Sequence, residues 1–194
     1  VLVGMEVFFF YYESWTPPDV RQLEAFLKQG PEEARSLLIG AASLDLMALA
    51  RRIGQDSCVV CSDREEALRQ LESQGSWRLV VFFAERLGDE AQAKADAKTM
   101  FRLCGMAKTR VVVVTAGAFE GARRHKVIWD VAAALREENG ELRLALVDVF
   151  DQVTQGELFR LVGVAVANCL RGRPCRDAVW SRNGWQFAEI KAVS

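Results

Sequence analysis

Arg110-Val-Val-Val-Val-Thr-Ala-Gly-Ala118 is the stretch around which the rest of this chain is read. Four consecutive β-branched residues lead into a turn of small residues, and helical spacing follows over Arg123–Glu138. A short apolar run bounded by turn residues indicates a strand buried on both faces of a parallel sheet. Since α/β folds bind ligands at the carboxyl ends of such strands, the Thr115–Ala118 turn is the first candidate for a functional site.

Segments of the same kind recur before and after this stretch. Further strands are predicted over Ser36–Ala42, Cys58–Cys61, Trp77–Ala84 and Leu142–Val147. Helices are predicted over Leu44–Ile53, Arg64–Gln74, Asp89–Cys104 and Thr154–Leu170. Strands that alternate with helices of roughly 10–15 residues predict βαβ units and a parallel sheet. A helix over Pro31–Ala42 remains an alternative to the first of these strands, because proline followed by two glutamates is typical of a helix start.

The amino-terminal end predicts a strand of another kind. Val1–Trp15 is rich in aromatic and β-branched residues, and Pro17 and Pro18 end it. A helix is predicted next, over Val20–Lys28.

The carboxyl-terminal end predicts a hairpin. Ala178–Arg182 and Trp185–Ile190 flank Asn183-Gly184, which is typical of a two-residue hairpin turn. We expect this hairpin to be separate from the parallel sheet and to pair with the amino-terminal strand. The whole chain is then one unit over residues 1–194, with an opening strand and helix in 1–30, a core in 31–172 and a closing hairpin in 173–194.

Composition indicates an ordinary globular chain. The 194 residues are 51% apolar and 26% charged, and the net charge is −1. That charge does not favour nucleic acid or an anionic membrane as a partner. No apolar run approaches the roughly 18 residues of a membrane span, and no segment is typical of a signal peptide. Because the first residue is valine, the chain is either processed or a piece of a longer chain, and we favour the piece.

The cysteines favour a reducing, cytoplasmic location, because they are scattered and odd in number. They are Cys58, Cys61, Cys104, Cys169 and Cys175. Cys58 and Cys61 have the spacing of a metal or redox pair, but they lie in a predicted strand, where positions i and i+3 face opposite sides. With His125 the only histidine, no second pair completes a zinc site. We predict two packed thiols and no metal.

The motifs that hold phosphates are absent. No G-x-G-x-x-G fingerprint occurs, and Gly117 and Gly121 have the wrong spacing to place backbone amides around a pyrophosphate. Gly40, near the end of a predicted strand, stands alone. A nucleotide-binding enzyme that uses the Thr115–Gly121 turn remains a minor alternative.

Acid–base and nucleophilic sites are also missing. His125 lies in the basic run Arg123–Lys126, so we expect it on a solvent-exposed helix face. Tyr11 and Tyr12 have no lysine four residues further on, which excludes the tyrosine–lysine pair of short-chain reductases. The sequence therefore predicts no catalytic, cofactor-binding or metal-binding residue.

A phosphoacceptor receiver domain would also contain five strand–helix units. It needs carboxylates after its first and third strands, where this chain has Ala41–Ser43 and Ala84-Glu85. Only Thr115 matches the receiver pattern. A degenerate receiver-like signalling or adaptor domain is therefore the alternative reading.

Three stretches, in the right order, resemble the structural subdomain of polyketide synthase ketoreductases. They are Phe10–Pro17; Thr115-Ala116-Gly117-Ala118 with Glu141-Leu142 and Leu146-Val147-Asp148; and the closing Val179–Gln186. Ala116 stands where the family often has arginine, and Val131–Leu135 lacks the family's frequent Gly-Leu-Gly. These departures indicate a divergent lineage or a pseudo-ketoreductase.

The resemblance implies a truncated, Rossmann-like (short-chain-reductase-like) parallel sheet flanked by helices, with an amino-terminal strand and a carboxyl-terminal hairpin appended. It implies a non-catalytic scaffold, without a cofactor of its own, that supports a catalytic subdomain or other polyketide synthase domains. That catalytic half would use NADPH to reduce β-ketoacyl chains held on an acyl carrier protein.

Overall fold

The computed structural model describes residues 5–11, 35–53, 58–73, 77–86, 88–107, 109–119, 123–150, 152–170, 177–181 and 184–192. Its strands are β1 (Met5–Tyr11), β2 (Arg35–Ile39), β3 (Cys58–Cys61), β4 (Trp77–Phe83), β5 (Arg110–Ala116), β6 (Leu144–Val149), β7 (Asp177–Ser181) and β8 (Gly184–Ala192). Its helices are α2 (Leu46–Ile53), α3 (Arg64–Ser73), α4 (Glu90–Met106), α5 (Lys126–Glu138) and α6 (Gln155–Leu170). The helix predicted over Val20–Lys28 lies outside the described residues.

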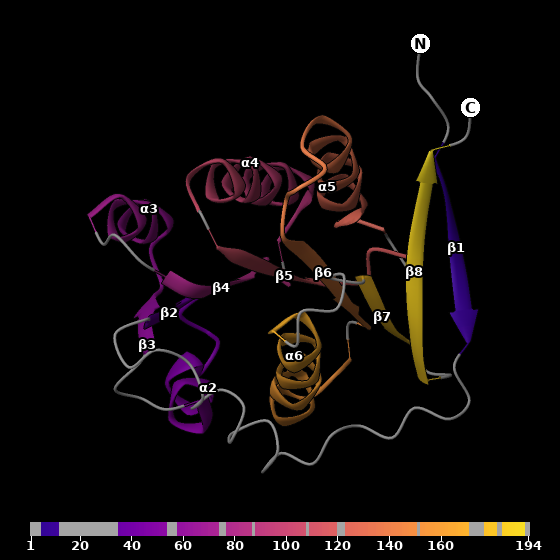
Figure 1. Ribbon diagram of the computed structural model, residues 1–194. Coiled ribbons are helices and arrows are strands. Elements are labelled where there is room, and N and C mark those ends of the chain that lie inside the picture. Colours follow the sequence, from indigo (N-terminus) through magenta and orange to yellow (C-terminus); the bar gives the residue numbers. More distant parts are fainter. Residues whose placement is uncertain are drawn as a thin grey trace.

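The strands form one sheet in the order β1-β8-β7-β6-β5-β4-β2-β3 (Figure 1). Neighbours from β3 to β7 are parallel, whereas β8 and β1 join antiparallel. The predicted parallel sheet flanked by helices is confirmed. β2 pairs with both β3 and β4, so Arg35–Ile39 is a strand and the alternative helix over Pro31–Ala42 is wrong.

The carboxyl-terminal hairpin differs in two ways from its prediction. β7 pairs in parallel with β6, so the hairpin continues the main sheet and is not separate from it. This pairing satisfies backbone groups of β6 that would otherwise form an exposed edge. Ser181 lies opposite Gly184, so Gly184 is part of β8 and not of a two-residue turn, and Asn183 lies outside the described residues. The expected pairing with the amino-terminal strand is confirmed, since Phe10 lies opposite Phe187.

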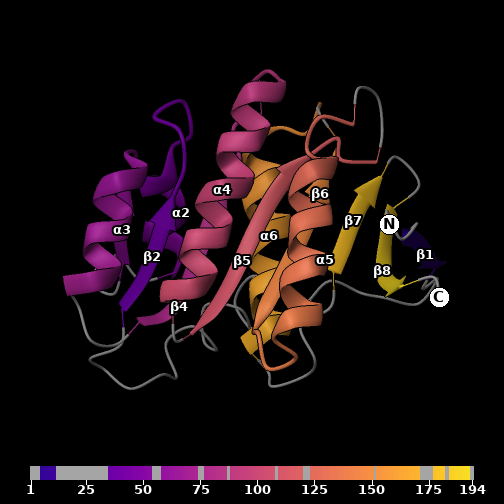
Figure 2. The ribbon, with the colours of Figure 1, turned by 90° about the horizontal axis from the view of Figure 1, so that it is seen from above.

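Helices cover both faces of the sheet (Figures 1 and 2). α2 and α6 pack on one face, and α3, α4 and α5 pack on the other. β4, β5, β6 and β7 follow one another in one direction across the sheet. Because α6 lies on the opposite face from α4 and α5, the β6–α6–β7 connection has the opposite hand to the two before it. Such a change of hand is rare in parallel sheets.

The valines of β5 are buried from both sides, as predicted. Val111 and Val113 pack in the cluster under α3, α4 and α5, and Val112 and Val114 pack in the cluster under α2 and α6. None of the four is more than 3% exposed. β5 therefore lies in the middle of the core, and its carboxyl end is held from both faces.

Capping interactions fix where the helices begin. The side chain of Asp89 accepts a hydrogen bond from Gln92 N–H at 2.8 Å at the start of α4. Thr154 and Glu157 form the predicted capping box of α6, in which each side chain accepts from the other residue's N–H. No helix in the described part of the chain has the length and apolarity needed to cross a bilayer.

Candidate functional site

The turn after β5 has the location at which α/β folds bind ligands. Three successive amides of this turn donate to groups of the chain itself. Ala116 N–H donates to His125 Nδ1 at 2.9 Å, Gly117 N–H donates to Val149 O at 2.8 Å, and Ala118 N–H donates to both oxygens of Asp148 at 2.9 and 3.0 Å. Gly117 has a φ of 64°, which favours glycine at this position. The turn is thus held closed by the protein's own acceptors.

Thr115, Trp129 and Asp148 form a buried group beneath this turn. The Thr115 hydroxyl donates to Asp148 Oδ1 at 2.7 Å and accepts from Trp129 Nε1 at 3.0 Å. All three side chains are nearly inaccessible to solvent. The Thr-x-Gly-Ala and Leu-Val-Asp motifs, which lie far apart in the sequence, therefore meet in one hydrogen-bonded cluster.

His125 does not lie on a solvent-exposed helix face, so that prediction was wrong. It is 2% exposed, and its Nε2 lies 3.1 Å from the backbone oxygen of Glu85. Because Nδ1 accepts from Ala116 N–H, the bonding requires the neutral tautomer with its proton on Nε2. The α5 helix begins only at Lys126, so helical spacing did not apply to His125. The neighbouring Arg123 and Lys126 are the exposed members of the basic run.

A second buried polar group was missed from the sequence. Asp96 of α4 is 0% exposed, accepts from Glu85 N–H at 2.8 Å and from Gln92 Nε2 at 3.2 Å, and pairs with Arg64 of α3. Burial raises the pKa of the Asp96 carboxyl, and the Glu85 N–H and the Arg64 charge oppose that rise. One signal could have revealed it: Asp96 has helical spacing to Met100 and Leu103, which are buried.

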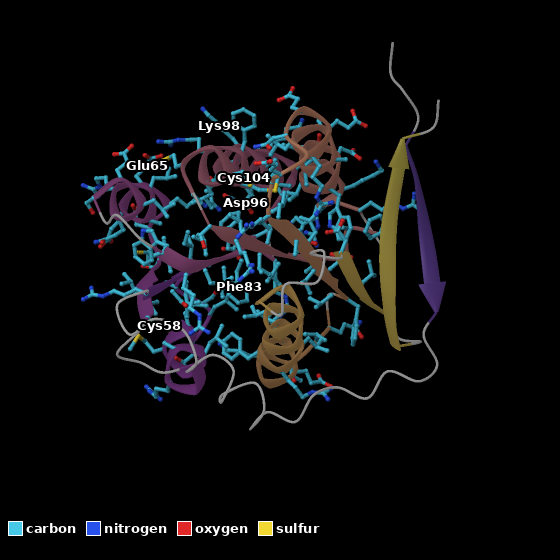
Figure 3. The ribbon with its side chains drawn as sticks, viewed as in Figure 1. Cys58, Glu65, Phe83, Asp96, Lys98 and Cys104 are labelled. Carbon is cyan, nitrogen blue, oxygen red and sulfur yellow. The ribbon has the colours of Figure 1, made fainter. Side chains whose placement is uncertain are left out.

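These two groups are linked through Glu85. Its carbonyl oxygen faces His125 and its N–H donates to Asp96, so hydrogen bonds run from the turn after β5 to helices α4 and α3. We call Arg64, Glu85, Asp96, Ala116 and His125 the Glu85 network. Figure 3 shows Asp96 between α4 and the sheet. Every link in the network holds one element against another, and this arrangement is suited to rigidity at the carboxyl edge of the sheet.

No protein-family model and no curated protein sequence matches the chain. Solved structures do match it, at 14% identity. The first ketoreductase of the tylosin polyketide synthase has a TM-score of 0.60 over 98% of this chain and 41% of that chain. A-type ketoreductases from a modular polyketide synthase give a TM-score of 0.56 over 99% of this chain and 43% of that chain.

The fold is similar to part of these polyketide synthase ketoreductase structures. The chain spans about two fifths of the length of these solved ketoreductases. The Rossmann-like sheet flanked by helices, which the resemblance implied, is therefore confirmed.

The turn from β2 to α2 is tightly packed around Gly40. A Cβ atom added to Gly40 would lie 3.1 Å from Phe83 Cβ and 3.3 Å from a Cδ1 atom of each of Leu44 and Leu46. A side chain at position 40 would therefore require these neighbours to shift. The two leucines that follow it bring apolar side chains to a turn at which nucleotide-binding α/β folds place glycines.

A cavity of about 550 Å³ lies between α3 and α4 at the carboxyl ends of β2 and β4. Charged residues of both signs line it, including Asp63, Glu65, Lys98 and Arg102. Arg102 pairs with Glu65 at 2.6 Å, and Figure 3 shows Glu65 and Lys98 on the outer side of their helices. The mixed charges do not favour one class of ligand.

Cys58 and Cys61 face opposite sides of the sheet, as predicted. Cys58 packs toward α2 (Figure 3), whereas Cys61 packs in the cluster under α3. Burial raises the pKa of the Cys58 thiol to about 11 and also raises that of Cys61. Within the described ranges, no three His, Cys, Asp or Glu side chains are grouped so as to hold a metal ion.

Proposed function

We propose that this chain is a non-catalytic scaffold of a polyketide synthase module, which stabilises a ketoreductase catalytic subdomain or a neighbouring domain. One observation carries the proposal. The amides of Ala116, Gly117 and Ala118, at the location of an α/β active site, donate to His125, Val149 and Asp148. They are therefore not available to a cofactor phosphate or to a substrate oxygen.

The packing around Gly40 supports the same proposal. Leu44, Leu46 and Phe83 approach Gly40 closely, so apolar side chains pack around this residue at a turn where nucleotide-binding α/β folds place glycines. In place of reactive groups, the carboxyl edge carries the Glu85 network, which joins β4, β5, α3, α4 and α5. A rigid carboxyl edge of this kind is suited to binding a partner domain.

The proposed partner supplies the chemistry. The catalytic subdomain would bind NADPH and reduce the β-carbonyl of an acyl chain held on an acyl carrier protein. The ketoreductase fold, and a span of about two fifths of the solved ketoreductases, support this division of labour. This chain would contribute packing and orientation.

Two measurements test the proposal. First, the chain is titrated with NADPH by calorimetry and assayed alone for reduction of a β-ketoacyl thioester; we expect no binding and no turnover. Micromolar NADPH binding or turnover by the chain alone would overturn the non-catalytic assignment.

Second, a ketoreductase catalytic subdomain produced on its own is mixed with this chain. We expect its melting temperature and its reduction rate to rise, because folded partners are stabilised by binding. The heat-unfolded chain is the control. An equal response of the catalytic subdomain to the folded chain and to the heat-unfolded chain would contradict the proposed partnership.

A further inference from the structure

We propose that a second cavity at the carboxyl edge binds the phosphoryl group of free phosphate or of a small organic phosphate. Its volume is about 350 Å³. Its lining comes from the loops after β2, β4 and β5 and from the start of α6, and consists of Ala41, Ser43, Leu44, Ala84, Glu85, Arg86, Arg124 and Gln155. β2 and β4 are neighbouring strands. From β2 the chain continues to β3 on one side of this pair, and from β4 it continues to β5 on the other side. Open α/β sheets bind ligands at a point where the strand order reverses in this way.

Gln155 provides evidence that an acceptor is missing from this cavity. Its side-chain Nε2 is buried and has no hydrogen-bond partner among the described residues. Buried donors in proteins are nearly always satisfied, so an unsatisfied one calls for a water or a ligand. Gln155 lines the cavity, and an oxygen atom of a bound group there could accept from it.

Arg86 and Arg124 supply positive charge to the same space. Arg86 Nη2 donates to Val153 O at 3.1 Å, and Arg124 Nη1 donates to Gly88 O at 3.1 Å. These bonds anchor two planar groups that each carry five N–H donors. Both side chains are half-buried, so their orientation is restricted by packing. Guanidinium groups held in this way are the preferred protein donors to phosphate.

The chemistry of the lining favours a phosphoryl group. Among the described lining residues, Arg86 and Arg124 are basic and Glu85 is acidic, and the amide of Gln155 and the hydroxyl of Ser43 add neutral donors. Donors from several loops suit the tetrahedral oxygens of a phosphoryl group better than the planar pair of a carboxylate. Ala41, Leu44 and Ala84 form an apolar wall for a small carbon body. The volume is at the low end for ligand sites, roughly 300–1,000 Å³, which excludes a dinucleotide.

The test is calorimetric titration of the full chain with inorganic phosphate, glycerol 3-phosphate and acetate, at constant ionic strength near neutral pH. We expect saturable binding of phosphate or glycerol phosphate and much weaker binding of acetate. Tighter binding of glycerol phosphate identifies an organic phosphate as the ligand, and equal binding identifies free phosphate. Absence of saturable phosphate binding, or equal binding of acetate, would overturn the proposal.

Four variants sharpen the test. Gln155→Glu keeps the side-chain volume and adds a negative charge, so it should weaken phosphate binding by at least about tenfold, and Arg86→Gln should do the same. Glu85→Gln removes the carboxylate that the described residues contribute to the lining and should strengthen binding. Arg51→Gln changes an exposed arginine of α2 outside the lining and should bind as the unmodified chain does.

Unfolding curves confirm that each variant is folded before titration. Binding by Gln155→Glu that equals binding by the unmodified chain would place the phosphate elsewhere and overturn the proposal. This result is independent of the scaffold role, which is decided by NADPH binding and by turnover.

Discussion

The Nδ1 atom of His125 accepts a hydrogen bond from the backbone N–H of Ala116 at 2.9 Å. The ring therefore contacts the end of β5 through Nδ1. Its Nε2 lies against the carbonyl oxygen of Glu85, which follows β4. A protonated imidazole would present an N–H to the Ala116 N–H and lose this bond. His125 acts here as a structural connector whose neutral form is required by the fold.

Replacing His125 with alanine should lower the free energy of unfolding by about 1–3 kcal/mol, because two buried polar groups lose their partner. Urea unfolding followed by tryptophan fluorescence measures the change. Lys126→Ala, at the adjacent exposed position, is the matched control and should change stability by less than about 0.5 kcal/mol. Equal effects at both positions would contradict the structural role of the ring.

Thr115→Val keeps the shape of the side chain and removes its hydroxyl. It leaves Trp129 Nε1 and Asp148 Oδ1 without this partner in a buried space, so we expect a loss of about 1–3 kcal/mol. Thr115→Ser retains the hydroxyl and its hydrogen bonds, so its free energy of unfolding should fall less than that of Thr115→Val. Chemical denaturation of both variants decides the matter; a valine variant as stable as the serine variant would show that the hydroxyl is dispensable.

The raised pKa of Asp96 predicts a particular pH dependence. Since burial favours the protonated carboxyl in the folded state, the stability contributed by this group is present at low pH and is lost as pH rises through the folded pKa. Asparagine does not ionise, so the Asp96→Asn variant does not lose this stability as pH rises. The stability of the Asn variant relative to the unmodified chain should therefore increase upward from about pH 4.

Denaturant unfolding across this pH range gives the difference directly. Asp130→Asn, at a half-exposed position of α5, provides the matched control for the same chemical change outside the buried group. A difference for Asp96→Asn that falls with rising pH would mean that its ionised form is the favoured one.

Arg136 and Asp177 should be coupled energetically. Arg136 donates two hydrogen bonds of 2.6 Å to the carboxylate of Asp177, which also accepts from Leu146 N–H of β6 at 2.9 Å. Arg136→Leu leaves a buried carboxylate unpaired and should destabilise the fold by about 3 kcal/mol. Arg136→Lys keeps the charge but not the two parallel hydrogen bonds. Its stability should therefore lie between that of the unmodified chain and that of Arg136→Leu. Hydrogen exchange at the Leu146 amide reports on β7 locally; unchanged exchange in the leucine variant would refute the coupling.

Cys104 should be unreactive in the folded protein. Burial raises the pKa of its thiol to about 12, with partial opposition from the Arg136 charge, so little thiolate exists near pH 8. We expect a disulfide reagent to modify Cys104 only after denaturant is added, as peptide mapping by mass spectrometry would detect. Rapid modification of this residue under native conditions would contradict its burial.

The elements of regular structure were predictable because local signals agree with burial. The valine run of β5, the strand Cys58–Cys61 and the Thr154–Glu157 capping box each carry a short-range pattern, and each is found where it was predicted. The position of the candidate site, the turn after β5, was predictable for the same reason. α/β folds bind ligands at the carboxyl ends of strands that are buried on both faces.

Other features depend on contacts between distant segments. His125 precedes a helix, so its burial is decided by Glu85 and Ala116 and not by periodicity. Asp96 looks like an ordinary polar residue of a charged helix until Glu85 N–H and Arg64 meet it. The parallel pairing of β7 with β6 likewise has no counterpart in the local sequence of the hairpin.

The pairing of β1 with β8 has a consequence for how this domain can be carried by a longer polypeptide. Met5 lies opposite Ala192, and Figure 1 shows the start of β1 and the end of β8 side by side. A polypeptide that enters through β1 and leaves through β8 departs next to where it arrived, and domains with adjacent ends tolerate insertion and circular permutation. A segment that begins with β1 and ends with β8 therefore starts and finishes at one place on the edge of the sheet.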